Sequence, residues 1–231
     1  MSTFLMTRPA DEARKSGQKL ESLGHRVVYA PMIKIEQVSF ELPDESRSLI
    51  ITSKNGARYG LPNISNKGRP IFAVGDQTAL EARALGFTNV TTGPGTARQL
   101  IPLLLECGIS QKREYTHLCG NNIAYDIADV LRQEGLDANN TVTYQAVPNR
   151  VFSPSVQEEM EHGTIDGVLF YSPRTATIFE ETVSESDCHH WLPKLDAYCF
   201  SNRVADELLG PWKTISSAVL PTEKALFSLF E

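Results

Sequence analysis

The chain has 231 residues, of which 41% are hydrophobic and 22% charged, a balance typical of one large globular domain or two small ones. The formal net charge of −6 disfavours a general nucleic-acid binder, which normally has a basic face, although local donors could still bind a small anion. No apolar run is long enough to cross a bilayer, and the first residues lack the pattern of a signal peptide, so we expect a cytoplasmic protein that does not bind membranes.

Short apolar or β-branched runs alternate with helical patterns along the whole chain. The predicted strands are 4–7, 27–33, 49–52, 70–74, 89–92, 115–119, 141–147, 167–171, 197–200 and 214–219. The predicted helices are 11–23, a segment after Ser53, 75–86, 96–106, 122–134, 155–161, 175–183, 202–209 and 222–230. Strands that alternate with helices in this way predict an α/β fold with parallel sheets and helices on both faces.

The second half of the chain repeats the order of features in the first half. The matched pairs are 49–53 with 168–172, 72–75 with 198–201, Thr96 and Leu100 with Thr222 and Leu226, and 27–29 with 142–144. Each match is weak by itself, because any two α/β segments share such features. Their preserved order favours an internal duplication.

The repeated units can be combined into two lobes in two ways. In the first arrangement, 37–147 forms a continuous lobe, while 1–35 joins 150–231 in a discontinuous one. In the second arrangement, each half of the chain folds by itself, with one linker near 108–113. We favour the first, because both connections between its lobes look extended and could pair as a two-stranded linker.

Small, polar and cationic residues follow the predicted strands, where helices begin. These turns are Thr7-Arg8, Ser53-Lys54-Asn55-Gly56, Gly75-Asp76-Gln77-Thr78, Gly120-Asn121-Asn122, Ser172-Pro173-Arg174-Thr175 and Ser201-Asn202-Arg203. Helix capping explains any one of them. Because ligands of open parallel sheets bind beyond the carboxyl ends of strands, the whole set predicts a polyanion site in a cleft between the lobes.

Signatures of common cofactor sites are missing from the sequence. It contains no GxGxxG after a strand, no phosphate-binding loop with its lysine and no GxSxG turn. Cys188-His189-His190 lies in a polar stretch without a second group of ligands, so we interpret it as a solvated loop. The residues therefore give no support for a dinucleotide site, a nucleoside-triphosphate site or a metal ion.

Several of these turns, in this order, resemble the uroporphyrinogen-III synthase family over nearly the whole chain. The motifs are Thr7-Arg8-Pro9, the segments 50–57, 73–79 and 142–147, Phe170-Tyr171-Ser172-Pro173 and Leu220-Pro221-Thr222. The resemblance implies two flavodoxin-like lobes, one of them discontinuous, joined by a two-stranded ladder.

The resemblance also implies an activity. Hydroxymethylbilane, a linear tetrapyrrole with many carboxylates, would be cyclised to uroporphyrinogen III with inversion of ring D and loss of water, without a cofactor. Such a lyase of haem biosynthesis acts mainly by holding the reactive substrate in the right geometry. We expect a monomer, with transient handover of the substrate from hydroxymethylbilane synthase and no nucleic-acid partner.

The resemblance implies individual roles for the residues at the turns. Tyr144 matches a family tyrosine proposed to donate a proton to the departing hydroxyl, although a tyrosine on this strand could also simply pack near the linker. The expected substrate-binding residues are Arg8, Ser53, Lys54, Asn55, Thr78, Gly120, Asn121, Ser172, Arg174, Ser201 and Arg203. Where many members of the family have two threonines, this chain has Arg203-Val204, so contacts there could involve a salt bridge instead.

Two other functions remain open from the sequence. A non-catalytic, two-lobed binding module for a polycarboxylate would share the architecture, and so would a transferase that acts on another polycarboxylate. The formation of isomer III from hydroxymethylbilane would distinguish the synthase from both.

Overall fold

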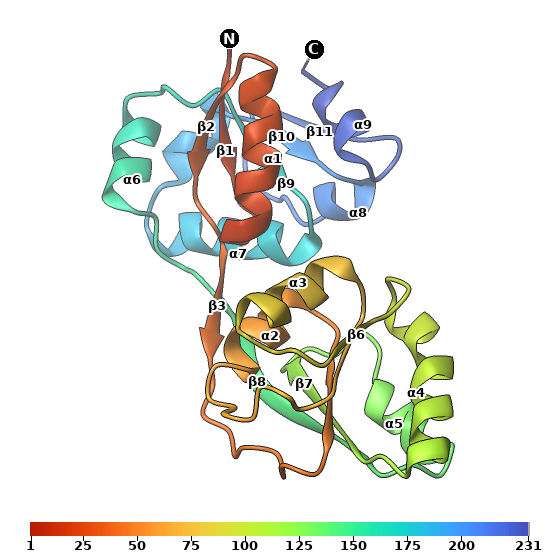
Figure 1. Ribbon diagram of the computed structural model, residues 1–231. Helices are drawn as coiled ribbons and strands as arrows, with labels where there is room; N and C mark the ends of the chain where they lie inside the picture. The colour runs from red at the N-terminus through yellow and green to blue at the C-terminus, as the bar shows by residue number, and fades with distance from the viewer. Residues whose placement is uncertain (231) are drawn as a thin grey trace. The chain divides into compact units, whose positions relative to one another are not determined.

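The computed structural model describes residues 1–230, which form two compact units (Figure 1). The first unit contains Met1–Lys34 and the chain from Val147 onward, and the second is Ile35–Ala146. In the described part of the chain, no helix is long and apolar enough to cross a membrane.

The first unit is built on a five-stranded parallel sheet with the order β11-β10-β9-β1-β2. Its strands are β1 (Thr3–Met6), β2 (Arg26–Tyr29), β9 (Gly167–Phe170), β10 (Asp196–Cys199) and β11 (Thr214–Ser217). Its helices are α1 (Ala10–Ser22), α6 (Pro154–Glu161), α7 (Pro173–Glu185), the 3-10 helix η1 (His189–Lys194), α8 (Asn202–Ala205) and α9 (Glu223–Phe227). Counted along the chain, the strand order is the 2-1-3-4-5 of one class of doubly wound sheets.

Both faces of this sheet are covered, which explains why its central strands are apolar throughout. Phe4 and Leu169 pack with Leu226 of α9 in one core. On the other face, the rings of Phe170 and Phe179 of α7 are 5.2 Å apart. Buried parallel strands require such continuous apolar runs, in contrast to strands with one face in water.

The second unit is built on a six-stranded sheet with the order β3-β8-β7-β4-β5-β6. Its strands are β3 (Ile33–Gln37), β4 (Ser48–Ile51), β5 (Ile71–Ala73), β6 (Val90–Thr92), β7 (Tyr115–Gly120) and β8 (Ala138–Pro148). Its helices are α2 (Lys54–Gly60), α3 (Asp76–Ala84), α4 (Ala97–Gln111) and α5 (Ile127–Gln133). Strands β4 to β8 pair in parallel, and two separate apolar cores lie on the two faces.

The sheets confirm the repeated order of features. β4 and β9 occupy corresponding places in the two sheets, as do β5 and β10, and also β8 and β2. The matched threonines have the same role: Thr96 caps α4 by accepting the Gln99 amide, and Thr222 caps α9 by accepting the Ala225 amide. The second sheet thus repeats the first with its strands in a permuted chain order.

One strand and two helices are among the predicted elements that differ from the structure. The strand predicted over 27–33 is interrupted before Ile33, because Pro31 has no amide hydrogen to donate to a neighbouring strand. The helix predicted over 122–134 begins only at Ile127, where Asp126 caps it by accepting the Asp129 amide. The helix predicted over 202–209 is a single turn that ends at Ala205.

Candidate functional site

The carboxyl edge of the second sheet brings the hydroxyls of a tyrosine and a serine together. Ser53 follows β4 and is the N-cap of α2, where its Oγ accepts a hydrogen bond of 3.0 Å from the Gly56 amide. A serine here satisfies one of the amides that the first helical turn leaves unpaired. The same Oγ lies 3.0 Å from the hydroxyl of Tyr144 on β8. The helix cap therefore also contacts the tyrosine predicted to be catalytic.

A β-bulge directs Tyr144 towards this edge. Along the β7–β8 pair, Cys119 lies opposite Val142, but the next residue, Gly120, lies opposite Tyr144. Thr143 is the extra residue, and it is buried. Bulges change the direction of the side chains that follow them. Here the ring of Tyr144 lies so close to Gly120 that a Cβ on Gly120 would be 2.6 Å from ring atom Cε2.

Further contacts hold Tyr144 from both sides. The Asn121 amide donates a 3.1 Å hydrogen bond to the Tyr144 carbonyl, and the Asn121 side-chain oxygen accepts one of 3.3 Å from the Ala146 amide. The rings of Tyr59 and Tyr144 are 5.9 Å apart, and the Tyr59 hydroxyl donates to the Ile35 carbonyl. The predicted residues Gly120 and Asn121 thus lie directly beside Tyr144.

The other predicted residues of this unit lie on the first turns of α2 and α3. Lys54 donates a 3.1 Å hydrogen bond from Nζ to Oε1 of Gln77. Asn55 is half-buried on α2, whereas Thr78 on α3 is only 5% exposed and donates its amide to the Gly75 carbonyl. The edge of the second sheet therefore presents hydroxyls, amides and a lysine.

Arg8, at the carboxyl end of β1 in the first unit, already has a carboxylate partner. Its Nη1 lies 3.0 Å from Oγ of Ser16 and 3.0 Å from Oε1 of Glu223. Its guanidinium carbon lies 4.2 Å from the centre of the Tyr171 ring, a cation–π distance. Burial raises the pKa of the Tyr171 hydroxyl to about 12, so the group beneath Arg8 remains neutral. A ligand carboxylate at Arg8 would have to share it with Glu223 or displace Glu223.

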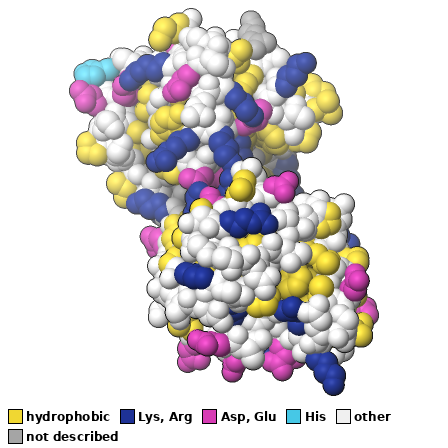
Figure 2. Space-filling view, in the orientation of Figure 1, with side chains coloured by type: hydrophobic (Ala, Val, Ile, Leu, Met, Phe, Trp, Pro, Cys, Tyr) yellow, Lys and Arg dark blue, Asp and Glu magenta, His cyan; other side chains and the backbone are white. Residues whose placement is uncertain are grey.

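A pocket of about 580 Å³ opens beside Arg8 within the first unit. Its lining residues are Arg8, Glu12, Lys15, Ser16, Lys19, Phe200, Pro221, Thr222 and Glu223. Basic and acidic side chains are also interspersed over the face shown in Figure 2. Binding of an anion on this face would therefore depend on local donors rather than on a broad basic surface.

The remaining predicted residues lie after β9 and β10 of the first unit. Ser172 caps α7, and its Oγ accepts a 3.2 Å hydrogen bond from the Thr175 amide. Arg174 is exposed on the first turn of α7. Ser201 precedes α8, and Arg203 is exposed on that helix. The predicted residues thus form one group on each sheet, at the carboxyl ends of the strands.

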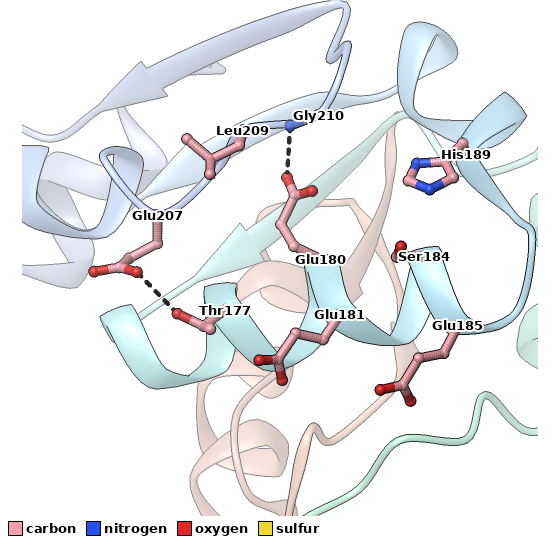
Figure 3. Close-up of a pocket in the computed structure, with 9 residues that line it drawn as sticks. All are labelled: Thr177, Glu180, Glu181, Ser184, Glu185, His189, Glu207, Leu209 and Gly210. Atoms are coloured by element: carbon pink, nitrogen blue, oxygen red, sulfur yellow. Dashed lines mark hydrogen bonds between the residues drawn. The ribbon is translucent and has the colours of Figure 1, made fainter.

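A second pocket of the first unit, of about 480 Å³, is strongly acidic (Figure 3). Of its carboxylates, Glu180 accepts hydrogen bonds from the Gly210 amide and Trp212 Nε1, and Glu207 accepts one from Thr177. The acidic side chains of this pocket would repel a polyanion. In residues 1–230, no cluster of His, Cys, Asp and Glu has a geometry that could hold a metal ion.

Sequence reasoning missed a buried polar group beneath the edge of the second sheet. His117 lies on β7, with Nε2 2.8 Å from Oγ1 of Thr52 and Nδ1 2.9 Å from Oδ1 of Asn140. The signal was a single histidine in an otherwise apolar strand, but its partners depend on the strand register. Glu223, the partner of Arg8, was missed for the same reason, because it lies 215 residues further along the chain.

This chain has doubly wound parallel sheets with polar residues at the carboxyl ends of the strands. Proteins of this class bind small ligands at that edge of the sheet. The family model for uroporphyrinogen-III synthase HemD matches residues 15–228. The chain therefore belongs to the uroporphyrinogen-III synthase family, whose members are cyclising lyases of haem biosynthesis.

Solved structures of this family resemble the chain over nearly its full length. The uroporphyrinogen-III synthetase of Helicobacter pylori 26695 is 18% identical, with 99% of this chain and 98% of that chain covered and a TM-score of 0.58. The wild-type uroporphyrinogen III synthase of Thermus thermophilus is 15% identical, with 99% and 96% covered and a TM-score of 0.43. At such identities the Helicobacter structure supports the fold alone. No curated protein matches the sequence.

Proposed function

We propose that this protein cyclises hydroxymethylbilane to uroporphyrinogen III, with inversion of ring D and loss of water, and that Tyr144 donates a proton to the departing hydroxyl. The observation that supports this role is the 3.0 Å contact between the hydroxyls of Tyr144 and Ser53 at the carboxyl edge of the second sheet, in a member of this family.

The contact suggests how the proton is supplied. The Ser53 oxygen already accepts the Gly56 amide, so its own hydrogen can be directed to the Tyr144 oxygen. The hydrogen of Tyr144 is then available to the substrate hydroxyl. As the carbon–oxygen bond of the substrate breaks, the hydroxyl takes this proton and leaves as water, and the hydrogen bond from Ser53 stabilises the tyrosinate that remains.

The proton balance closes within the same cycle. Loss of the hydroxyl leaves an azafulvene-like cation on ring A, and the substituted α-carbon of ring D attacks it to give a spirocyclic intermediate. The bond from this carbon to the methylene bridge of ring C then breaks, which leaves a second azafulvene-like cation on ring C. The free α-carbon of ring D attacks that methylene to close the macrocycle, and the proton lost from this carbon as the pyrrole is restored returns to Tyr144. Because the cation is reactive by itself, the enzyme contributes mainly by orienting ring D.

Cations and helix N-termini of each unit are proposed to bind the carboxylates of the substrate. The cations are Arg8, Lys54, Arg174 and Arg203, and the helix-capping hydroxyls are those of Ser53 and Ser172. The other proposed contacts are Asn55, Thr78, Gly120, Asn121 and Ser201. Charge-assisted hydrogen bonds to carboxylates suit a ligand with many acidic groups.

We also propose two flavodoxin-like lobes joined by a two-stranded linker. Support comes from the strand orders of the two sheets and from the pairing of β3 with β8. The Val38 amide donates to the Thr143 carbonyl at 3.1 Å, and the Asn149 amide donates to the Met32 carbonyl at 2.9 Å. A monomeric state, a cytoplasmic location, cofactor independence and substrate handover from hydroxymethylbilane synthase stay predictions.

The decisive test is an assay with enzymatically generated hydroxymethylbilane in which isomers I and III are separated. The proposed enzyme forms isomer III faster than the substrate closes spontaneously to isomer I. Formation of isomer I alone, at the rate without protein, would contradict the proposal and favour a non-catalytic binding module.

A further inference from the structure

The buried histidine of β7 belongs to a chain of polar side chains in the second unit. His117 is only 1% exposed, and its ring nitrogens contact Thr52 and Asn140. Asn140 Nδ2 in turn donates a 2.9 Å hydrogen bond to Oδ1 of Asp126. The same carboxylate oxygen accepts the Asp129 amide at the start of α5.

The partners define the direction of every hydrogen bond in this chain. Burial raises the pKa of Asp126, but the hydrogen bonds from Asn140 and the Asp129 amide outweigh it and lower that pKa below its usual value. The ionised carboxylate only accepts, so Asn140 directs its NH₂ towards Asp126 and its oxygen towards His117. Nδ1 of His117 must then carry a hydrogen.

His117 is consequently a neutral acceptor towards Thr52. Burial lowers the pKa of His117, although the hydrogen bond to Asn140 and the charge of Asp126 act in the opposite direction. A neutral ring with its hydrogen on Nδ1 has a lone pair on Nε2, which accepts the Thr52 hydroxyl. Thr52, His117 and Asn140 therefore each donate a hydrogen bond to the next group in this series of side chains.

These hydrogen-bonded side chains connect the segments that hold the proposed site. Within the sheet, His117 lies opposite Ile50 of β4 and Asn140 of β8. Thr52 continues from β4 and immediately precedes Ser53, whereas β8 continues from Asn140 to Tyr144. An apolar residue at position 117 would fill the core without needing hydrogen-bond partners. A series of hydrogen-bonded polar side chains at this place therefore indicates that the segments it joins must be held in defined positions.

We propose that His117 is a positioning residue for the proposed reaction: it holds the Thr52 hydroxyl and thereby sets the place of the Ser53 hydroxyl against Tyr144. The inference rests on the proposed function. It concerns only the second unit, which contains all of these residues.

Thr52→Val tests the proposal, because valine keeps the shape of threonine and removes its hydroxyl. We expect kcat for isomer III to fall roughly two- to tenfold, the effect of one net hydrogen bond, with KM nearly unchanged. Thr52→Ser keeps the hydroxyl and should recover most of the rate. Thr116→Val is the control, since Thr116 is a buried threonine of β7 whose hydroxyl is hydrogen-bonded to Arg47 instead of His117.

A double-mutant cycle separates positioning from general destabilisation. If Thr52 acts through Ser53 and Tyr144, Thr52→Val should change kcat little further in the Tyr144→Phe background. An equal fold-loss in both backgrounds, or Thr52→Val at the wild-type rate, would overturn the proposal. Wild-type protein that forms no isomer III would overturn the proposed function as well, so the two failures are distinguishable.

A spectroscopic measurement examines the histidine directly. In full-length protein labelled with ¹⁵N in histidine, the His117 ring should show a hydrogen on Nδ1 and none on Nε2 at neutral pH. The opposite tautomer, or a doubly protonated ring, would contradict the assigned hydrogen bonds and overturn the proposal.

Discussion

The hydroxyl of Tyr144 lies 3.0 Å from the hydroxyl of Ser53, although the two residues are 91 positions apart in the chain. Both belong to the second unit, so the geometry of the proposed proton donor is established within Ile35–Ala146. The first unit contains no part of this pair. Removal of the phenol hydroxyl and removal of a cation should therefore have different kinetic effects.

Tyr144→Phe should lower the initial rate of isomer III formation and leave product binding nearly intact. General acid catalysis typically increases a reaction rate by about 10²–10⁴-fold. We expect the rate to fall by at most ~10²-fold, because hydroxymethylbilane ionises readily and water can substitute as the proton donor.

Tyr29→Phe is the matched control, because Tyr29 occupies the corresponding strand of the other sheet and packs against Gly17 of α1. Wild-type rates for both variants would leave Tyr144 as a packing residue.

Gly120→Ala should displace the Tyr144 ring. The added Cβ would be 2.6 Å from ring atom Cε2, which is too close for the ring to keep its place. We expect a rate loss similar to that of Tyr144→Phe and a loss of about 1–3 kcal/mol in the free energy of unfolding from overpacking.

Gly68→Ala is a suitable control for this variant, since its Cβ would meet Asn66 at an ordinary 3.5 Å. Urea unfolding and initial rates measure the two effects. A Gly120→Ala enzyme with normal turnover would show that the ring can move without consequence.

Single replacements of Arg8, Lys54, Arg174 and Arg203 by Ala should each weaken binding of uroporphyrinogen III modestly. A charge-assisted hydrogen bond is worth roughly 1.5–3 kcal/mol when buried and less when solvated. The difference in affinity between wild type and each variant should be larger at low salt than at high salt, because salt screens exposed charges.

Lys67→Ala provides the control for the cations, because Lys67 lies before β5, over the Phe87 ring, at the opposite end of the strand from the proposed site. Four unchanged affinities would mean that these cations do not bind the ligand.

Acid should destabilise the protein partly through His117. Burial lowers its folded-state pKa below the ordinary value of 6.5, so between the two values only the unfolded chain binds the proton. The free energy of unfolding should therefore fall as the pH drops below about 6.5, by up to about 1.4 kcal/mol per pH unit, until the folded-state pKa is reached.

Urea unfolding of wild type and His117→Leu from about pH 7 to about pH 5 measures this contribution. The free energy of unfolding of the variant should change less with pH, because the variant lacks the His117 ring but shares all other titrating groups with the wild type. Parallel pH profiles would mean that His117 titrates alike in both states.

A fragment of residues 35–146 should unfold in a single cooperative thermal transition. It contains a complete set of central strands and two apolar cores, which is what an autonomous domain needs. Circular dichroism of the isolated fragment is the measurement. A fragment without a transition would mean that this unit needs the rest of the chain in order to fold.

The alternation of strands and helices was enough to predict an α/β fold with parallel sheets, and the repeat matched strands that have corresponding places in the two sheets. Local patterns also explain the caps: Ser53 and Ser172 each follow a strand, and each accepts an amide of the next helix. These features depend on residues close together in the chain.

Features that depend on the pairing of distant segments were not predictable. The bulge at Gly120 exists only once β7 lies beside β8, and nothing in either strand alone indicates it. The partners of His117 come from separate segments, and Arg8 pairs with a carboxylate at the far end of the chain.

The discontinuous first unit has a consequence for the order in which the chain folds during synthesis. β1 pairs on one side with β2, but its other neighbour, β9, is made only after the whole second unit. We expect Ile35–Ala146 to fold on the ribosome while β1 still lacks this neighbour. A premature stop codon after Pro148 would then leave one complete domain preceded by β1, α1 and β2 with an unpaired strand edge, a ready substrate for proteases.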